Sequence, residues 1–250
     1  MLKRVAGVLA VVLLAAVAVY ATDPWKDKDF TSWDEKDVQR ILQDSPWSHK
    51  VQYGMNAGGG MEGNLTAGGE AASHGDPNAS PTTTTLNSRS RNSSGGAGAP
   101  NAGAETVFVV SWFSSNTIRE AEARRKELAG TSADEARKGL STPSDTYQIM
   151  VISQNMRAFA RATEDDLKAQ AYLILKSTKA KIAPSRVAIQ KGQTGMPVAL
   201  FFIFDKKTAT GEPTFAPDEK GVEFSFQAVK TTLKITFDFT KMQNKQGLDI

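Results

Sequence analysis

The chain has 250 residues, with 30 lysines and arginines against 27 aspartates and glutamates, a net charge of +3 at pH 7 and no cysteine. Its basic residues are spread among a nearly equal number of acidic ones, which argues against a nucleic-acid partner. The lack of cysteine excludes a thiol nucleophile, a thiolate zinc site and an iron–sulfur cluster, and it leaves burial rather than disulfides to stabilise the fold.

The first 21 residues have the pattern of a secretory signal peptide. Lys3 and Arg4 precede an unbroken apolar run over residues 5–21, and the chain turns polar at Thr22. We expect cleavage after Ala21 and export to the periplasm or the cell exterior. The alternative is an uncleaved anchor, because about 17 apolar residues is the short limit for a membrane span. Membrane contact is expected only through this helix, if it stays attached.

Residues 22–53 are predicted to form a helix followed by a strand. Ser32 and Glu35 have the spacing of a capping box. Pro46 cannot continue a helix, so we expect the helix to stop near Asp44. Trp47, His49 and Val51 then alternate with polar residues, as in a strand. A lone helix and strand of this length are not stable in water. The segment is therefore predicted to dock on the main domain, with its strand joining the sheet.

Residues 54–104 are predicted to be a disordered linker, because this tract of Gly, Ala, Asn, Ser, Thr and Pro has almost nothing to bury. Asn64, Asn78 and Asn92 begin N-x-S/T triplets that would suit glycosylation. Such triplets are also expected by chance in a tract of this composition.

Residues 105–250 are predicted to form the main domain. The runs 106–113 and 147–153 are apolar on both faces, which is typical of central strands. Between them we expect a helix capped by Thr117 and Glu120 and ended by Gly130, and a short helix capped by Ser132. A third helix, capped by Thr163, is predicted from Glu164 to about Ser177.

The last third of the chain is rich in predicted strands, over residues 186–190, 197–204, 222–227 and 232–239. The last two alternate apolar and polar residues and are close in sequence, so we expect a hairpin with one face in water. The fold class is α+β: a mixed, mostly antiparallel sheet with helices packed on it.

No catalytic, nucleotide or metal motif occurs in the sequence, and no cofactor is expected. His74 falls in the linker, so a histidine-based site would depend on His49 alone, which is more typical of a half-exposed strand residue. Glu164, Asp165 and Asp166 form the densest carboxylate cluster. They could act as acid and base or bind calcium. Their place in a first helical turn also suits the helix dipole without any ligand.

Trp25, Trp33 and Trp47 are concentrated in the N-terminal segment. Exposed tryptophans in an exported protein could stack on sugars or peptides. A short helix also needs large aromatic side chains to bury it against its neighbours, and we favour this packing role.

The stretch KDFTSWDEKDVQRILQDSPWSHKV resembles the N-terminal segment of a set of exported bacterial proteins, in which W-x-x-K-D-F, a short helix and D-S-P-W follow a signal peptide. SSNTIREAEARR and GMPVALFFIF look like a helix and strand of the same proteins. Some of these are labelled GWxTD-domain proteins, although the G-W-x-T-D motif does not occur here. The resemblance implies export and the domain layout, and it carries over no functional residues.

The sequence therefore favours an exported, non-catalytic binding or assembly module of the cell envelope, with an envelope protein or a glycan as partner. One alternative is a hydrolase-like enzyme that uses carboxylates such as Asp165 and Asp166. A second alternative is an envelope spacer tethered by the uncleaved first helix.

Overall fold

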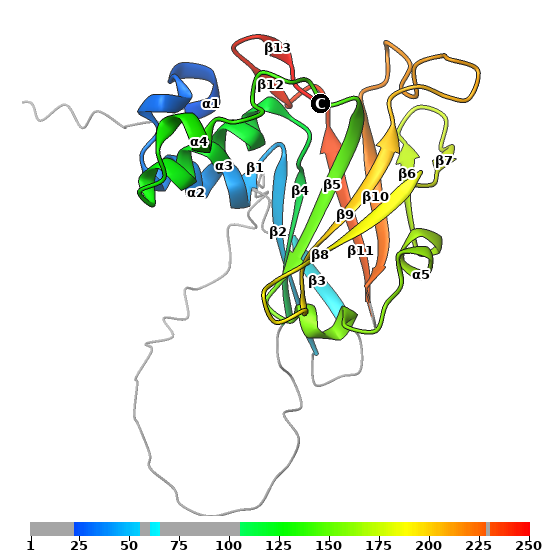
Figure 1. Cartoon of the computed structure of the whole chain (residues 1–250). Coiled ribbons are helices and arrows are strands. Elements are labelled where there is room, and N and C mark those ends of the chain that lie inside the picture. The colour runs from blue at the N-terminus through cyan, green and yellow to red at the C-terminus, as the bar shows by residue number, and fades with distance from the viewer. Residues whose placement is uncertain (1–22, 56–60, 66–105, 229–230) are drawn as a thin grey trace, which may run out of the picture.

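A computed structural model describes residues 23–55, 61–65, 106–228 and 231–250, and the side chains of residues 53–65 are outside this description (Figure 1). The predicted signal peptide and residues 66–104 of the predicted linker lie outside the described residues. The helical elements are α1 (Pro24–Asp27), η1 (Phe30–Ser32), α2 (Glu35–Gln43), α3 (Asn116–Leu128), α4 (Ala133–Ala136), η2 (Met156–Phe159) and α5 (Glu164–Ala169).

The strands of the described residues form two main sheets and one small hairpin. The first sheet has the order β1 (Asp44–Ser45), β2 (Ser48–Met55), β4 (Thr106–Trp112), β5 (Thr146–Ser153), β9 (Pro197–Asp205) and β8 (Arg186–Lys191), and β3 (Met61–Leu65) also pairs with β2. The second has the order β11 (Thr231–Asp238), β10 (Gly221–Ala228), β6 (Ala171–Leu175) and β7 (Lys181–Ile182). The hairpin consists of β12 (Gln243–Asn244) and β13 (Gly247–Leu248).

The α+β class is confirmed. The strand pairings between named elements are antiparallel throughout the described residues. The strands divide between two facing sheets rather than forming the one sheet that we expected. Helices α1 to α4 gather at one end of the first sheet, beside β1 and β2 (Figure 1).

The core lies between the two sheets. Phe202 of β9 contacts the rings of Phe224 and Phe226 of β10, at centroid distances of 5.2 and 4.7 Å. Trp112 of β4 meets Phe237 of β11 edge to face at 5.2 Å. The predicted period-two pattern of β10 and β11 is confirmed, since the apolar members are fully buried. The central position predicted for β4 and β5 is confirmed as well.

Helix α2 begins two residues later than the sequence predicts. Asp34, not Ser32, is its N-cap, and a capping box links Asp34 with Asp37 rather than Ser32 with Glu35. The Ser32 hydroxyl instead donates to the Asp29 carbonyl within the turn η1. Both boxes satisfy the spacing rule, and the preceding turn decides between them. The predicted end of the helix is confirmed, because Asp44 is the C-cap.

Strand β2 follows this helix and pairs with β4, with Ser48 opposite Ser111 and Tyr53 opposite Thr106. Residues far apart in sequence are thereby joined in one sheet. On its other side β2 pairs with β3, which falls inside the predicted linker. Strand β2 continues to Met55 and β3 covers 61–65, so both strands reach into the residues predicted as linker. Strand pairing uses backbone groups and needs no apolar side chains. The composition of residues 61–65 therefore does not predict that they pair with β2.

Helix α3 is capped by Ser115, whose hydroxyl accepts from the Ile118 N–H, so the predicted cap at Thr117 is wrong. Thr117 is buried and its hydroxyl donates to the Asp249 carboxylate. The predicted C-terminal glycine is confirmed, since Gly130 follows the C-cap with a positive φ of 96°. The predicted cap of α4 at Ser132 is also confirmed.

The predicted helix from Glu164 to Ser177 is correct only in its first half. Thr163 caps α5 as expected, but α5 ends at Ala169, and residues 171–175 form strand β6. Ala171 and Leu173 are buried at period two and lie opposite Phe226 and Phe224 of β10. The spacing of Leu167, Ala171 and Leu175 fits a helix equally well, so the partner strand decides the outcome.

Across the described residues, the structure has no helix that is both long enough and apolar enough to span a membrane.

Candidate functional site

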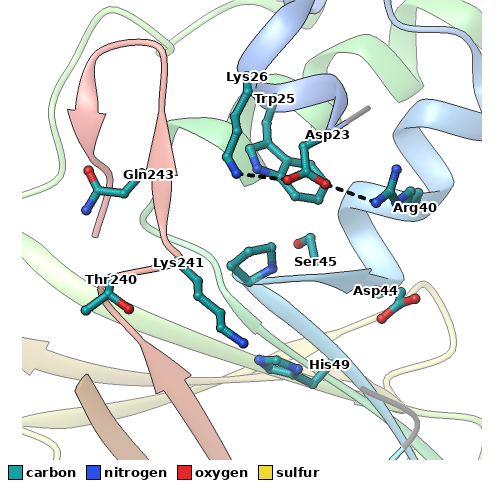
Figure 2. Close-up of a pocket in the computed structure, with 11 residues that line it drawn as sticks. Asp23, Trp25, Lys26, Arg40, Asp44, Ser45, His49, Thr240, Lys241 and Gln243 are labelled. Atoms are coloured by element: carbon teal, nitrogen blue, oxygen red, sulfur yellow. Dashed lines mark hydrogen bonds and ion pairs between the residues drawn. The ribbon is translucent and has the colours of Figure 1, made fainter. Parts of the chain in front are cut away.

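A cavity of about 500 Å³ opens between the N-terminal segment and the chain that follows β11 (Figure 2). This volume lies in the range of small-molecule sites in proteins. The walls are formed by Asp23, Trp25, Lys26, Arg40, Asp44, Ser45, Pro46, His49, Thr240, Lys241 and Gln243.

The upper wall of the cavity in Figure 2 comes from helix α1, whose first residue is Pro24. Proline suits this position because its fixed φ is helical and its missing N–H needs no partner there. The next residue, Trp25, is only 5% exposed and meets Trp47 edge to face at 5.6 Å. The Arg40 guanidinium lies 5.3 Å from the centre of the Trp25 ring, a cation–π distance. Trp25 is thus fixed from two sides.

The carboxylate of Asp23 is neutralised within this wall. It forms ion pairs with Lys26 at 2.9 Å and with Arg40 at 3.0 Å, both drawn in Figure 2. The two pairs are partly exposed, so each stabilises the fold weakly. Their main effects are to hold α1 beside α2 and to neutralise the negative charge of Asp23 at this end of the cavity.

Two ring nitrogens in the walls are buried and have no hydrogen-bond partner within the described part of the chain: Trp25 Nε1 and His49 Nε2. Buried polar atoms in proteins nearly always have a partner, so two such atoms around one cavity are unusual. Lys241 points toward His49 from the opposite wall (Figure 2). Two of the residues that line the cavity therefore carry a buried ring nitrogen that the described residues do not satisfy.

The surroundings of His49 favour the neutral form of its imidazole. Burial lowers the pKa of its imidazole below the ordinary value of 6.5, against the opposing pull of the Asp44 carboxylate and the Pro46 backbone. Its ring also packs on Phe237 at 5.4 Å. His49 has intermediate exposure, in agreement with the half-exposed strand position that the sequence predicts, and its ring packs toward the core.

Asp249, near the C-terminus, connects Trp47 with the start of helix α3. Trp47 is fully buried, and its Nε1–H donates to the Asp249 carbonyl at 2.6 Å. The Asp249 carboxylate accepts from the backbone N–H groups of Asn116 and Thr117 at 2.7 and 2.8 Å. A carboxylate at the start of helix α3 is favoured by the helix dipole and by the unpaired N–H groups there.

Glu120, on the next turn of α3, has a raised pKa. Burial raises the pKa of its carboxyl from 4.5 to about 7, and the charges of Asp249 and Asp29 act in the same direction, against a weaker opposing effect of Arg119. Glu120 lines a smaller cavity of about 80 Å³ beside the first one, which Trp25 also borders.

This carboxyl predicts a pH dependence of stability. The folded protein keeps the Glu120 proton up to about pH 7, whereas the unfolded chain loses it near pH 4.5. Between these values the folded state binds more protons, so stability should fall as the pH rises. Glu120→Gln should remove this fall and raise stability at pH 8 by roughly 1–2 kcal/mol, after a discount for partial exposure.

The measurement is thermal unfolding of both proteins from pH 5 to pH 8. Glu212→Gln, at an exposed loop position, is the matched control and should leave the profile unchanged. Parallel profiles for wild type and Glu120→Gln would contradict the prediction.

The carboxylates singled out in the sequence are not at this cavity. Glu164, Asp165 and Asp166 are exposed in the first turn of α5, well away from α1 in Figure 1. The hydroxyl and N–H of Thr163 donate to Asp166 and hold its pKa below the usual value. Of the three N-terminal tryptophans, Trp25 lines the cavity, whereas Trp33 and Trp47 are buried against neighbouring elements.

Sequence reasoning missed Asp23, Arg40 and Lys241 as members of a site. Lys241 is more than 200 residues from Asp23 and Arg40 in the sequence, and no motif links it to them. The only local signal was the concentration of tryptophans around His49. Across the part of the chain that the structure describes, no group of three or more His, Asp or Glu side chains could hold a metal ion.

No protein family model matches this chain, and neither curated proteins nor solved structures give a match. Fold and site therefore define the class of protein here: two facing antiparallel sheets, with a polar and aromatic cavity where the N-terminal segment meets the C-terminal residues.

Proposed function

We propose that this chain is an exported binding protein of the cell envelope, and that the cavity around Trp25, His49 and Lys241 is its ligand site. The observation that carries the proposal is the pair of buried ring nitrogens without partners in the wall of a cavity large enough for a small molecule. A ligand that supplied those partners would recover the cost of burying them.

Export is supported by the charge and apolar pattern of residues 3–21. Mass spectrometry of the mature protein tests it: Thr22 as the first residue is expected. An intact N-terminus on a membrane-bound protein would favour the tethered spacer instead.

Binding without catalysis is favoured because the carboxylate cluster at residues 164–166 is exposed and its member Asp166 is engaged in the capping box of α5. If that cluster were catalytic, Asp165→Ala together with Asp166→Ala would abolish a measured activity while the protein stayed folded. We expect no such loss.

The ligand site is tested by filling it. The wild-type protein is incubated with an extract of envelope metabolites, recovered by ultrafiltration and analysed by mass spectrometry for retained small molecules. Gln243→Trp places a large ring in the cavity wall and should abolish retention. Gln193→Trp, on an exposed turn between β8 and β9, is the matched control and should retain the same molecules. Equal retention by both variants would refute the assignment of the site.

A further inference from the structure

The geometry points to a small organic anion as the ligand of this cavity, with its anionic group at the end formed by Lys241 and His49. This inference rests on the proposed function and deepens it by naming the chemical class of the ligand. Carboxylates and phosphates share this chemistry, and the experiment below separates them.

The charge of the walls gives the first argument. Lys26, Arg40 and Lys241 face the two carboxylates of Asp23 and Asp44. Asp23 is matched by ion pairs with Lys26 and Arg40, and the Asp44 carboxylate acts on His49, so the three cations and two carboxylates of the walls leave a net charge of +1. The Lys241 ammonium has no ion pair or hydrogen bond with the described residues, and its charge acts at longer range on the Asp238 carboxylate. A cation facing a cavity in this way attracts a negative group.

The position of the polar groups gives the second argument. Figure 2 shows Lys241 extended toward His49, with both side chains at the same end of the cavity. The buried His49 Nε2 has no partner in the described structure, and an anion between the two side chains would bond with the ammonium and favour a proton on the imidazole. At the other end, Trp25 Nε1–H is a second buried donor without a partner. It can only donate, so it suits an oxygen of the same ligand.

The shape gives the third argument. Trp25 and Pro46 add apolar surface to the walls, so a bare inorganic ion would leave much of the cavity uncovered. A molecule with an organic body and one anionic group matches both the apolar middle and the cationic end.

The test follows the indole N–H signals of the full-length protein labelled with ¹⁵N-tryptophan, in which Trp25→Phe identifies the Trp25 signal. The probes are benzoate and phenyl phosphate, each beside its uncharged counterpart, benzamide or phenol. We expect the Trp25 signal to move saturably with at least one of the anions and about ten-fold more weakly with its neutral counterpart. Preference between benzoate and phenyl phosphate distinguishes a carboxylate ligand from a phosphate.

Lys241→Gln removes the charge and keeps the length, and it should weaken binding of the anion about ten-fold. Lys245→Gln, an exposed lysine in the neighbouring β12–β13 turn, controls for net charge and should change affinity less than about two-fold. If benzamide binds as well as benzoate, the anionic class is wrong while the cavity remains a ligand site. If no probe moves the Trp25 signal saturably, the inference is overturned. Equal affinity of the wild type and Lys241→Gln for the anion would overturn it as well.

Discussion

Replacing Trp47 by alanine is expected to destabilise the protein by roughly 3–5 kcal/mol, the largest effect of any single substitution considered. The indole is fully buried and connects three parts of the chain. Trp47 directly precedes β2, its ring meets Trp25 edge to face, and its Nε1–H donates to the Asp249 carbonyl. Alanine would leave a cavity among all three and an unpaired buried carbonyl.

Chemical denaturation of the purified variant measures this loss. Trp47→Phe keeps most of the apolar volume but loses the hydrogen bond, so it should cost less than half as much as alanine. Because β2 pairs with β4, the rest of the first sheet should unfold in the same transition as the N-terminal segment. A loss below about 1 kcal/mol, or two separate transitions, would mean that the segment is not part of the core.

Asp249→Ala is expected to cost roughly 2–4 kcal/mol, because it removes the acceptor for three hydrogen bonds at the start of helix α3. The Asn116 and Thr117 N–H groups and the Thr117 hydroxyl would lose their partner in a buried place. The variant keeps the backbone carbonyl that accepts from Trp47, so the effect should report on the carboxylate alone.

Asp249→Ala should also lower the pKa of Glu120 toward its ordinary value, because one of the two nearby negative charges is gone. NMR titration of the Glu120 carboxyl measures this second effect, and denaturation measures the first. Asp218→Ala, at an exposed loop position, is the control for stability and should behave as the wild type. An unchanged Glu120 titration in Asp249→Ala would show that the Asp249 charge does not contribute to the raised pKa.

Much of the local structure follows from the sequence. The strict alternation around Leu233, Ile235 and Phe237 predicts a strand with one buried face, and β11 has that pattern because side chains in a strand point to opposite faces. The continuous apolar run at residues 197–204 predicts an interior strand, and β9 lies between β5 and β8. Pro46 and Gly130 end their helices where expected, since each restricts or permits backbone angles locally.

Local signals failed wherever two patterns competed for the same residues. Ser32 with Glu35 and Asp34 with Asp37 both satisfy the capping-box spacing. The Ser32 hydroxyl bonds within the turn η1, so Asp34 caps the helix. The sequence of residues 171–175 fits a helix or a strand. These residues form a strand because they pair with the backbone of β10. Strand β3 could not be predicted at all from side chains, because its pairing with β2 depends on backbone groups.

By itself, the sequence determined the fold class, most strand positions and the concentration of tryptophans at the N-terminal segment, because these depend on neighbours within a few residues. Only the tertiary structure decided the candidate site. Asp23, His49 and Lys241 come from segments more than 190 residues apart along the chain. The pairing of β2 with β4, together with the packing of the C-terminal residues on α3 and Trp47, brings them around one cavity. Burial then alters the pKa of His49 and Glu120, and no pattern of neighbouring residues contains that information.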